Sequence, residues 1–223
     1  MENHGKLITL LLCATLFGGC YSGATVVPDT LKNSIGMIMV RMPSGYYVSK
    51  YETRQSEFEA VMGYNPSRFL GKNHPVEKVT ATEADEFCRR LTQLEQEKGT
   101  LPEGYIYDLP TFTQWKQYVA DASLDKAIVP KEIGKNQYAE FDSHQPVGSG
   151  DVNRLGLYDL RGNVKEYSRD VYRSYYSRIV LGASWNTYRT DHQRKDNRGG
   201  IVDISKKSFD IGFRCVLIPA NTR

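Results

Sequence analysis

The segment TATEADEFCRRLTQLEQEKG, residues 80 to 99, constrains the fold more than any other part of the sequence, because it predicts one long helix and the face that this helix buries. Thr80 and Glu83 have capping-box spacing, in which each side chain bonds the backbone N–H of the other residue. Gly99 ends the segment. We expect Cys88 to point into the core, because apolar residues recur at helical intervals at Ala84, Phe87, Cys88, Leu91 and Leu94.

Two shorter helices are also predicted. The first lies between Thr53, its expected N-terminal cap, and Gly63, which is expected to stop it. The second begins at Thr111, with Gln114 in the capping-box position. Its predicted buried stripe is more typical of core than of a ligand site and consists of Trp115, Tyr118, Val119 and Ala122.

The remaining signals are those of short strands. Residues 37 to 52 predict a hairpin with its turn at Pro43, Ser44 and Gly45. Beyond residue 125, β-forming residues separated by Gly, Asn and Asp predict short strands and long irregular loops. One face of an expected terminal strand would carry Ile211, Phe213, Cys215 and Leu217. The mixture of helices and short strands favours an α+β fold.

The N-terminus predicts export. Residues 1 to 19 have the plan of a secretory signal, with Lys6 in a short polar start, an apolar run and small residues at the end. The apolar run is too short to span a bilayer as a helix. Cys20 follows directly and is the predicted lipidation site of a bacterial lipoprotein, the alternative being an ordinary signal with an incidental cysteine. Residues 20 to 35 are expected to form a tether.

Cysteine use narrows the choices further. Cys13 leaves with the signal and Cys20 would carry lipid, so only Cys88 and Cys215 remain for the folded part. Two thiols in an exported domain favour one disulfide. The alternative is two separate buried thiols.

Six phrases occur in an order that resembles the formylglycine-generating enzyme, or sulfatase-modifying factor, family: KYETRQSEFEAVMGYNPSRF, HPVEKVTATEADEFCRRL, LPTFTQWKQYVA, PVGSGDVNRLGLYDLRGNVKEY, LGASW and GFRCVL. The resemblance covers residues 36 to 218 as one domain. It implies an irregular α+β fold with a C-type-lectin-like core, short strands, a few amphipathic helices and many loops. It also implies a structural disulfide between Cys88 and Cys215, whose positions match EFC and GFRC in the family.

The resemblance also bears on catalysis. Oxidases of this family bind Cu(I) through two cysteines that follow a Gly-Ser-aromatic turn, and these positions fall on Thr187 and His192. Soft thiolates suit Cu(I), whereas a threonine hydroxyl does not. We therefore expect no copper and favour a noncatalytic member of the family. The alternative is an atypical metal site at His192, with His144, Asp191 and Asp196 as potential further ligands.

A structural Ca²⁺ is the one cofactor that the resemblance implies. Its ligands in the phrase RGNVKEY would be Asn163, the Val164 carbonyl and Glu166, since Ca²⁺ takes oxygen ligands. The alternative is a turn held by Asn163 with Glu166 in a surface ion pair. Asn136 and Asp142 are weaker candidates for another calcium loop of the family.

Tyrosine and arginine gather on the face where catalytic relatives hold their peptide groove. Both residue types are enriched at binding hot spots, because they bury area and keep polar groups. The alternative is that these are solvated loop residues on a structural module. The predicted binding groove contains Tyr172, Tyr175, Tyr176, Trp185, Thr187, Tyr188, Arg189, His192 and Arg194.

The sequence therefore predicts a lipid-anchored, noncatalytic binding or scaffold module of the bacterial cell envelope, on the outer membrane if the cell has one. Its partners would be the membrane, through lipid at Cys20, and an envelope protein or peptide. A formal net charge of +3 over 223 residues gives no strong steering field, so nucleic acid is not an expected partner. The alternative function is an enzyme of the same family with an atypical metal site.

Overall fold

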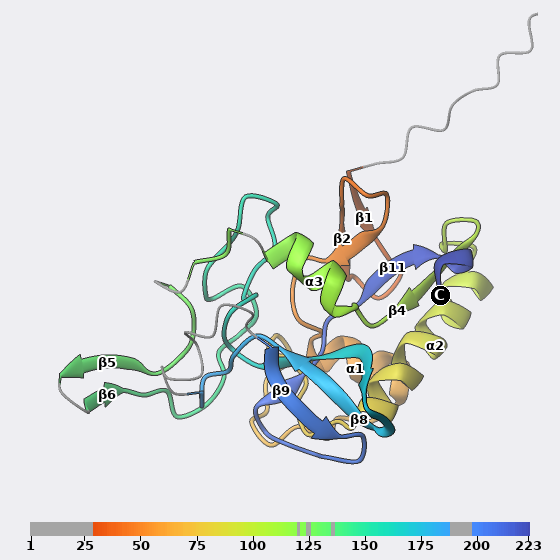
Figure 1. Ribbon diagram of the computed structural model, residues 1–223. Helices are drawn as coiled ribbons and strands as arrows, with labels where there is room; N and C mark the ends of the chain where they lie inside the picture. The colour runs from red at the N-terminus through yellow and green to blue at the C-terminus, as the bar shows by residue number, and fades with distance from the viewer. Residues whose placement is uncertain (1–28, 120, 124–125, 135–136, 188–197) are drawn as a thin grey trace, which may run out of the picture.

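Two small sheets and three helices make up the described fold (Figure 1). The computed structural model describes residues 29–119, 121–123, 126–134, 137–187 and 198–223. The larger sheet has the order β1 (Thr30–Lys32), β2 (Ile38–Arg41), β3 (Tyr47–Ser49), β11 (Val216–Pro219) and β4 (Tyr105–Asp108). The smaller sheet has the order β10 (Ile211–Gly212), β7 (Lys165–Tyr172), β8 (Ser174–Leu181) and β9 (Arg198–Asp203). This mixture confirms the predicted α+β class.

The peripheral elements are short. β5 (Lys131–Gly134) and β6 (Gln137–Ala139) form a separate antiparallel pair. A 3-10 turn, Ala220–Thr222, follows β11 near the C-terminus. Within the described residues, none of the helices combines the length and the apolar character that crossing a bilayer requires.

Two of the three predicted helices begin where their capping signals place them. In α2 (Ala81–Glu97), Thr80 Oγ1 accepts a hydrogen bond from Glu83 N at 3.0 Å, and Thr80 N donates to the Glu83 carboxylate at 2.7 Å. In α3 (Phe112–Val119), Thr111 and Gln114 make the equivalent pair of bonds. Each helix therefore satisfies N-terminal N–H groups that would otherwise lack a partner.

The first helix starts one residue later than predicted. Arg54, not Thr53, is the N-cap of α1 (Gln55–Met62), and Arg54 N donates to Glu57 Oε2 at 2.8 Å. Thr53 is fully buried, and its backbone N–H bonds Phe213 O. A tertiary hydrogen bond therefore holds Thr53, the residue that local preference assigned to the N-cap. Gly63 ends the helix with φ 82°, as its sequence position predicts.

The predicted N-terminal hairpin is confirmed, but the fold begins earlier than expected. β2 and β3 pair antiparallel, and Gly45 adopts φ 90° in the turn between them. The expected tether of residues 20 to 35 overlaps the fold, because β1 pairs with β2. Ser34 N also donates to the carboxylate of Glu95 on α2 at 3.1 Å. The cause is again non-local pairing, which no periodicity in residues 30 to 35 indicates.

The expected terminal strand is divided between the two sheets. β10 runs parallel to β7, whereas β11 lies between β3 and β4. The four residues predicted to share one face all enter the larger apolar cluster, against α1 and α2, and they are Ile211, Phe213, Cys215 and Leu217. Val216 and Ile218 point the other way into a second cluster with Trp115 and Tyr118 of α3. The C-terminal segment thus belongs to both halves of the core.

Cys88 and Cys215 are buried neighbours, as both arguments for a disulfide require. Their Sγ atoms lie 3.8 Å apart as thiols, which is longer than an S–S bond of about 2.05 Å. Burial raises the pKa of the Cys88 thiol well above its usual range. The covalent bond itself stays a prediction.

Candidate functional site

The β7–β8 hairpin presents two strongly exposed tyrosines of the predicted groove. Two strands of eight residues each form here, where short strands and irregular loops were expected, and their pairing contains register shifts. Arg173 makes the connection with φ 56°, between the paired residues Tyr172 and Ser174. Tyr175 and Tyr176 directly follow, with 86% and 73% of their surface exposed. Such exposure of two adjacent aromatic rings is typical of a contact surface.

Tyr172 contributes differently from these two. It is half-buried against the second apolar cluster, and the Arg173 guanidinium carbon lies 5.1 Å from its ring centroid. Two other arginines of the hairpin are engaged in ion pairs, Arg178 with Asp85 of α2 and Arg169 with Asp108 of β4 at 2.9 Å. These contacts hold the hairpin against the rest of the fold and leave the tyrosine pair projecting.

Trp185 is a core residue, contrary to its predicted place in the groove. It is 8% exposed, and its ring centroid lies 5.6 Å from that of Phe69 and 5.7 Å from that of Phe209. Within the described residues, its indole Nε1 has no hydrogen-bond partner. The family resemblance placed this ring in the groove, but packing against Phe69 and Phe209 buries it.

Thr187 is likewise buried, at 6% exposure, rather than lining an open groove. Its Oγ1 accepts from Ser184 N at 3.0 Å and lies 2.8 Å from Ser184 Oγ. Because Ser184 Oγ donates to Asp210, the Thr187 hydroxyl is the donor in the second contact. The hydroxyl therefore uses both its donor and an acceptor position within its own turn.

The rest of the predicted groove lies outside the described residues, namely Tyr188, Arg189, His192 and Arg194. The same holds for Asp191, Asp196 and the weak calcium candidate Asn136. In the described ranges, no group of three or more His, Cys, Asp or Glu side chains is arranged to hold a metal ion. The atypical metal site at His192 stays a prediction.

His144, a proposed companion of His192, belongs to a buried cluster that sequence reasoning missed. It is fully buried, and its Nδ1 lies 3.0 Å from Nδ1 of His74. Its Nε2 lies 3.8 Å from Oε1 of the buried Glu77. Burial and the neighbouring His144 lower the pKa of His74. The short Nδ1 contact holds one hydrogen, which one ring donates and the other accepts.

The turn predicted to bind Ca²⁺ uses its oxygens for internal contacts. Asn163 has φ 65°, its Oδ1 accepts from Gln145 N at 2.8 Å, and its Nδ2 donates to Glu52 at 2.6 Å. Val164 N donates to the other carboxylate oxygen of Glu52. Burial, followed by the nearby Asp159 and Glu166, raises the pKa of Glu52 well above its usual range. Glu52 therefore favours its neutral form.

Glu166 is held by an arginine. Its Oε1 accepts from Arg214 Nε at 2.9 Å, and the Arg214 side chain is fully buried. Arg214 also donates to the carbonyls of Ser49 and Tyr158. The ion pair expected as the alternative to calcium is present, but it lies in the core, not at the surface. The guanidinium neutralises the Glu166 carboxylate and so weakens its attraction for a second cation, and Ca²⁺ binding at this turn stays a prediction.

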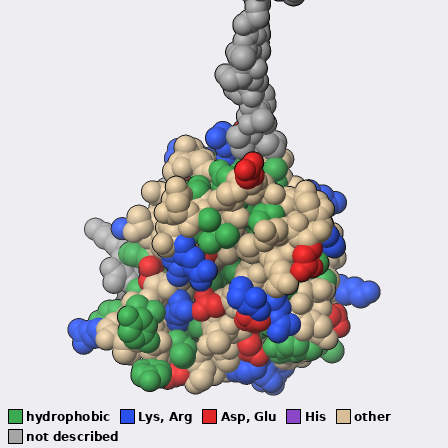
Figure 2. All heavy atoms as spheres, turned by 90° about the vertical axis from the view of Figure 1, so that its right-hand side faces the viewer, with side chains coloured by type: hydrophobic (Ala, Val, Ile, Leu, Met, Phe, Trp, Pro, Cys, Tyr) green, Lys and Arg blue, Asp and Glu red, His purple; other side chains and the backbone are tan. Residues whose placement is uncertain are grey.

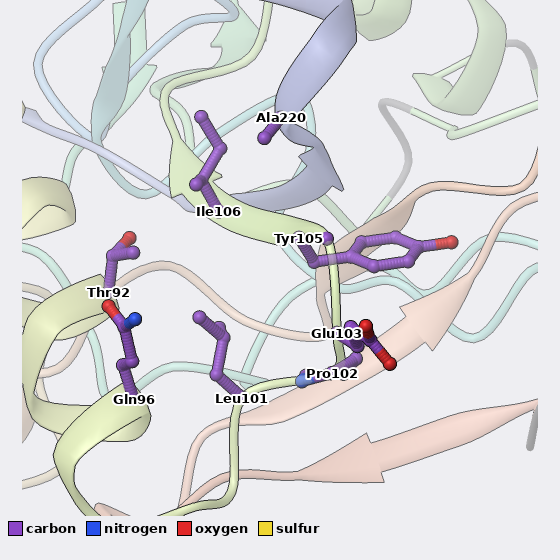
Figure 3. A pocket seen from close by; sticks show the side chains of 9 residues that line it. Thr92, Gln96, Leu101, Pro102, Glu103, Tyr105, Ile106 and Ala220 are labelled. Atoms are coloured by element: carbon purple, nitrogen blue, oxygen red, sulfur yellow. The ribbon is translucent and has the colours of Figure 1, made fainter.

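A cavity lies away from the tyrosines, between the end of α2 and β4 (Figure 3). Its volume is about 360 Å³, and most of its lining is apolar. Figure 3 shows Thr92 and Gln96 entering from α2 and Leu101 and Ile106 from the facing chain. Glu103 and Tyr105 are the titratable residues in this lining.

Charge is mixed on the face that carries α2 and the C-terminus (Figure 2). Blue and red side chains alternate there, and Glu86 pairs with both Arg89 and Arg90 along the helix. A nucleic-acid surface needs a basic stripe of one sign. This face has none.

Comparison with other proteins agrees with the fold. Chaperone protein LppX of Paenibacillus barcinonensis is 28% identical over 224 residues, which cover 73% of this chain and 80% of LppX. Variable protein 1 of Treponema denticola has a similar structure, with a TM-score of 0.60 and 22% sequence identity over 82% of this chain and 88% of that one. CarF has a TM-score of 0.56 and 18% identity over 84% of this chain and 95% of its own. PvdO from Pseudomonas aeruginosa has a TM-score of 0.63 and 17% identity over 84% of this chain and 97% of its own.

These likenesses establish the C-type-lectin-like, sulfatase-modifying factor fold that the sequence predicts. The family comparison extends over most of the chain. Residues 18–218 match the sulfatase-modifying factor enzyme 1-like domain. The chain therefore belongs to the sulfatase-modifying factor enzyme 1-like family.

Proposed function

We propose that this protein is a lipid-anchored, noncatalytic binding module of the bacterial cell envelope that holds polypeptides through its tyrosine hairpin. The tyrosine hairpin is β7 and β8 with Tyr175 and Tyr176. The observation that carries the proposal is the exposure of these two adjacent rings on a hairpin whose arginines are fixed to the core. Tyrosine buries a large area on binding at a low cost in side-chain entropy.

The turn at Thr187 supports a noncatalytic role. By the family resemblance, Thr187 stands where the oxidases have a copper-binding cysteine. Its hydroxyl is buried and engaged with Ser184. A hydroxyl in that position supplies no soft ligand to Cu(I).

The name of the relative LppX, a chaperone protein, supports a polypeptide as the bound molecule. A chaperone holds chains whose apolar side chains are not yet buried. Exposed tyrosine side chains suit such clients, because each ring buries a large apolar area and keeps a hydroxyl for a hydrogen bond. The partner we propose is therefore an exported protein in an unfolded state.

Binding can be measured by fluorescence anisotropy with a labelled unfolded probe, reduced and carboxymethylated lactalbumin. We expect Tyr175→Ala/Tyr176→Ala to weaken binding by about tenfold, as loss of an aromatic hot spot does. The matched control is Leu70→Ala/Val152→Ala, which removes apolar side chains that are 76% and 45% exposed outside the smaller sheet. Equal binding by wild type and the tyrosine variant would refute the proposal.

Anchoring and catalysis each have a direct test. We expect Cys20→Ser to move the protein from the membrane fraction to the soluble fraction, and retention on the membrane would exclude a lipid at Cys20. We expect no oxygen uptake with a cysteine-containing peptide. Oxygen-dependent turnover, or stoichiometric copper, iron or zinc that is lost in His192→Ala, would establish the enzyme alternative instead.

A further inference from the structure

Within the described residues, β9 is the last strand of the smaller sheet, and no strand pairs with its outer edge. β8 and β9 pair antiparallel with Ile179 opposite Ile201 and Ser177 opposite Asp203. Ile204 N donates to Tyr176 O at 3.0 Å, so the even-numbered residues of β9 bond β8. By the alternation of an antiparallel pair, the N–H and C=O of Ile201 point away from β8. No hydrogen bond occupies them in the part of the chain that the structure describes.

Other sheet edges are short or covered. β1 has only three residues. On β4, Tyr107 N donates to Thr92 Oγ1 of α2 at 2.9 Å. Beside β10, the chain at Val76 lies so close that a Cβ on Gly212 would come within 2.3 Å of its carbonyl oxygen. β9 has six residues and carries neither proline nor lysine, the residues that commonly protect an edge.

The tyrosine hairpin adjoins this edge. Tyr176 faces Ile204, directly after the end of β9. Tyr175 directly precedes Tyr176, in the part of β8 whose pairing with β7 is irregular. Ile201 is 50% exposed, so the edge has an apolar side chain as well as free main-chain groups. The two features form one continuous surface.

The position of this surface suits a partner rather than the anchor. In Figure 1, β8 and β9 lie at the end of the molecule opposite β1, the first strand of the described chain. A lipid at the N-terminus would therefore hold the molecule with its tyrosines and open edge away from the membrane. The occupant comes from the surrounding compartment.

We infer that the outer edge of β9 binds an extended segment of the client polypeptide as an added strand, with apolar side chains of the segment on the face of Ile201 and next to Tyr175 and Tyr176. This inference rests on the proposed function and names its mode of recognition. Strand addition draws its affinity from main-chain hydrogen bonds and its preference from alternate side chains. It therefore suits unfolded clients of varied sequence.

A series of labelled peptides tests whether main-chain bonds are made. The parent is an octapeptide of alternating valine and threonine, the second peptide has N-methyl groups along one edge only, and the third has them along both edges. We expect the first two to bind alike and the third to bind about tenfold more weakly, because it offers no N–H to β9 on either edge. Equal binding of all three peptides would overturn strand addition.

Two matched variants locate the site. Ile201→Lys places a charge on the open edge, whereas Val152→Lys places one outside the smaller sheet, at a side chain that is 45% exposed. We expect the first to weaken parent-peptide binding by about tenfold and the second to leave it unchanged. Unchanged binding of the parent peptide by Ile201→Lys would overturn the inference. The proposed function would still stand in that case if Tyr175→Ala/Tyr176→Ala weakens binding of unfolded lactalbumin. A dimer in sedimentation that Ile201→Lys dissociates would assign the edge to a second copy of the chain and also overturn the inference.

Discussion

The hydroxyl of Thr187 lies 2.8 Å from that of Ser184 and also accepts the Ser184 backbone N–H at 3.0 Å. Ser184 in turn donates to Asp210, which Lys165 pairs at 2.9 Å. The Thr187 side chain is therefore the inner end of a hydrogen-bonded chain and does not face a ligand-binding surface. The Thr187 hydroxyl stabilises this turn, but a hydroxyl is not a soft ligand for a metal ion.

Copper binding is the first prediction. We expect wild-type protein to retain no Cu(I) in a competition titration with a chromogenic chelator, since Thr187 offers no thiolate. Thr187→Cys/His192→Cys places sulfur at both positions of the family's copper site and is expected to gain stoichiometric binding. Thr187→Ser/His192→Ser is the control without sulfur. Tight Cu(I) on the wild type would show that the substitution pattern has been misread.

The buried pair of Arg214 and Glu166 gives the second prediction. Arg214→Met leaves the Glu166 carboxylate without its cation, and we expect the free energy of unfolding to fall by about 3 to 5 kcal/mol. Urea denaturation followed by circular dichroism measures this change. The control is Arg89→Met, which breaks an exposed pair with Glu86 and should leave stability unchanged. A small loss in Arg214→Met would mean that water reaches Glu166.

The third prediction concerns pH. Burial and the neighbouring His144 lower the pKa of His74 below 6.5, so the unfolded chain binds more protons than the folded chain as the pH falls through this range. His74 therefore contributes stability above pH 6.5 that is lost toward acid. We expect the urea midpoint to fall more between pH 7.5 and pH 5.5 in wild type than in His74→Gln.

Comparing wild type with His74→Gln isolates the contribution of His74 to the pH dependence of stability. Burial raises the pKa values of Glu52, Glu166 and Asp159, and raised carboxyl values act in the opposite direction, giving stability that declines as the pH rises. These groups are the same in both proteins. Parallel pH profiles for wild type and His74→Gln would contradict the assignment.

The fourth prediction is the disulfide. We expect protein purified from an exporting cell to show no free thiol in an Ellman assay under denaturing conditions. Reduction should lower the free energy of unfolding by about 4 to 5 kcal/mol in the chain-entropy model, because the bond would close a loop of over a hundred residues. The Cys88→Ala/Cys215→Ala variant should be insensitive to reductant. Two titratable thiols in the native exported protein would establish the separate-thiol alternative.

Sequence predicted those parts of the fold that local chemistry determines. The capping boxes at Thr80 and Thr111 act within four residues, so α2 and α3 begin where expected. Thr53 has an equally good local signal, but its backbone bonds Phe213 and the cap moves to Arg54. Local preference is worth only about 1 kcal/mol at a cap, and tertiary contacts exceed it.

The candidate site was less predictable, because its geometry depends on pairing between distant segments. Tyr175 and Tyr176 were identified by composition and are exposed, whereas Trp185 and Thr187, from the same reasoning, are buried. The open edge of β9 had no signal in a sequence of two glycines and two β-branched residues. Which strand lies last in a sheet is a property of the whole topology.

The placement of β11 in the interior of the larger sheet has a consequence for biogenesis. β11 is formed by Val216–Pro219 and separates β3 from β4, so these two strands have no common neighbour until the final residues are available. Every other strand of this sheet precedes β11 in the chain, so the sheet can be completed only after all of them have been synthesised.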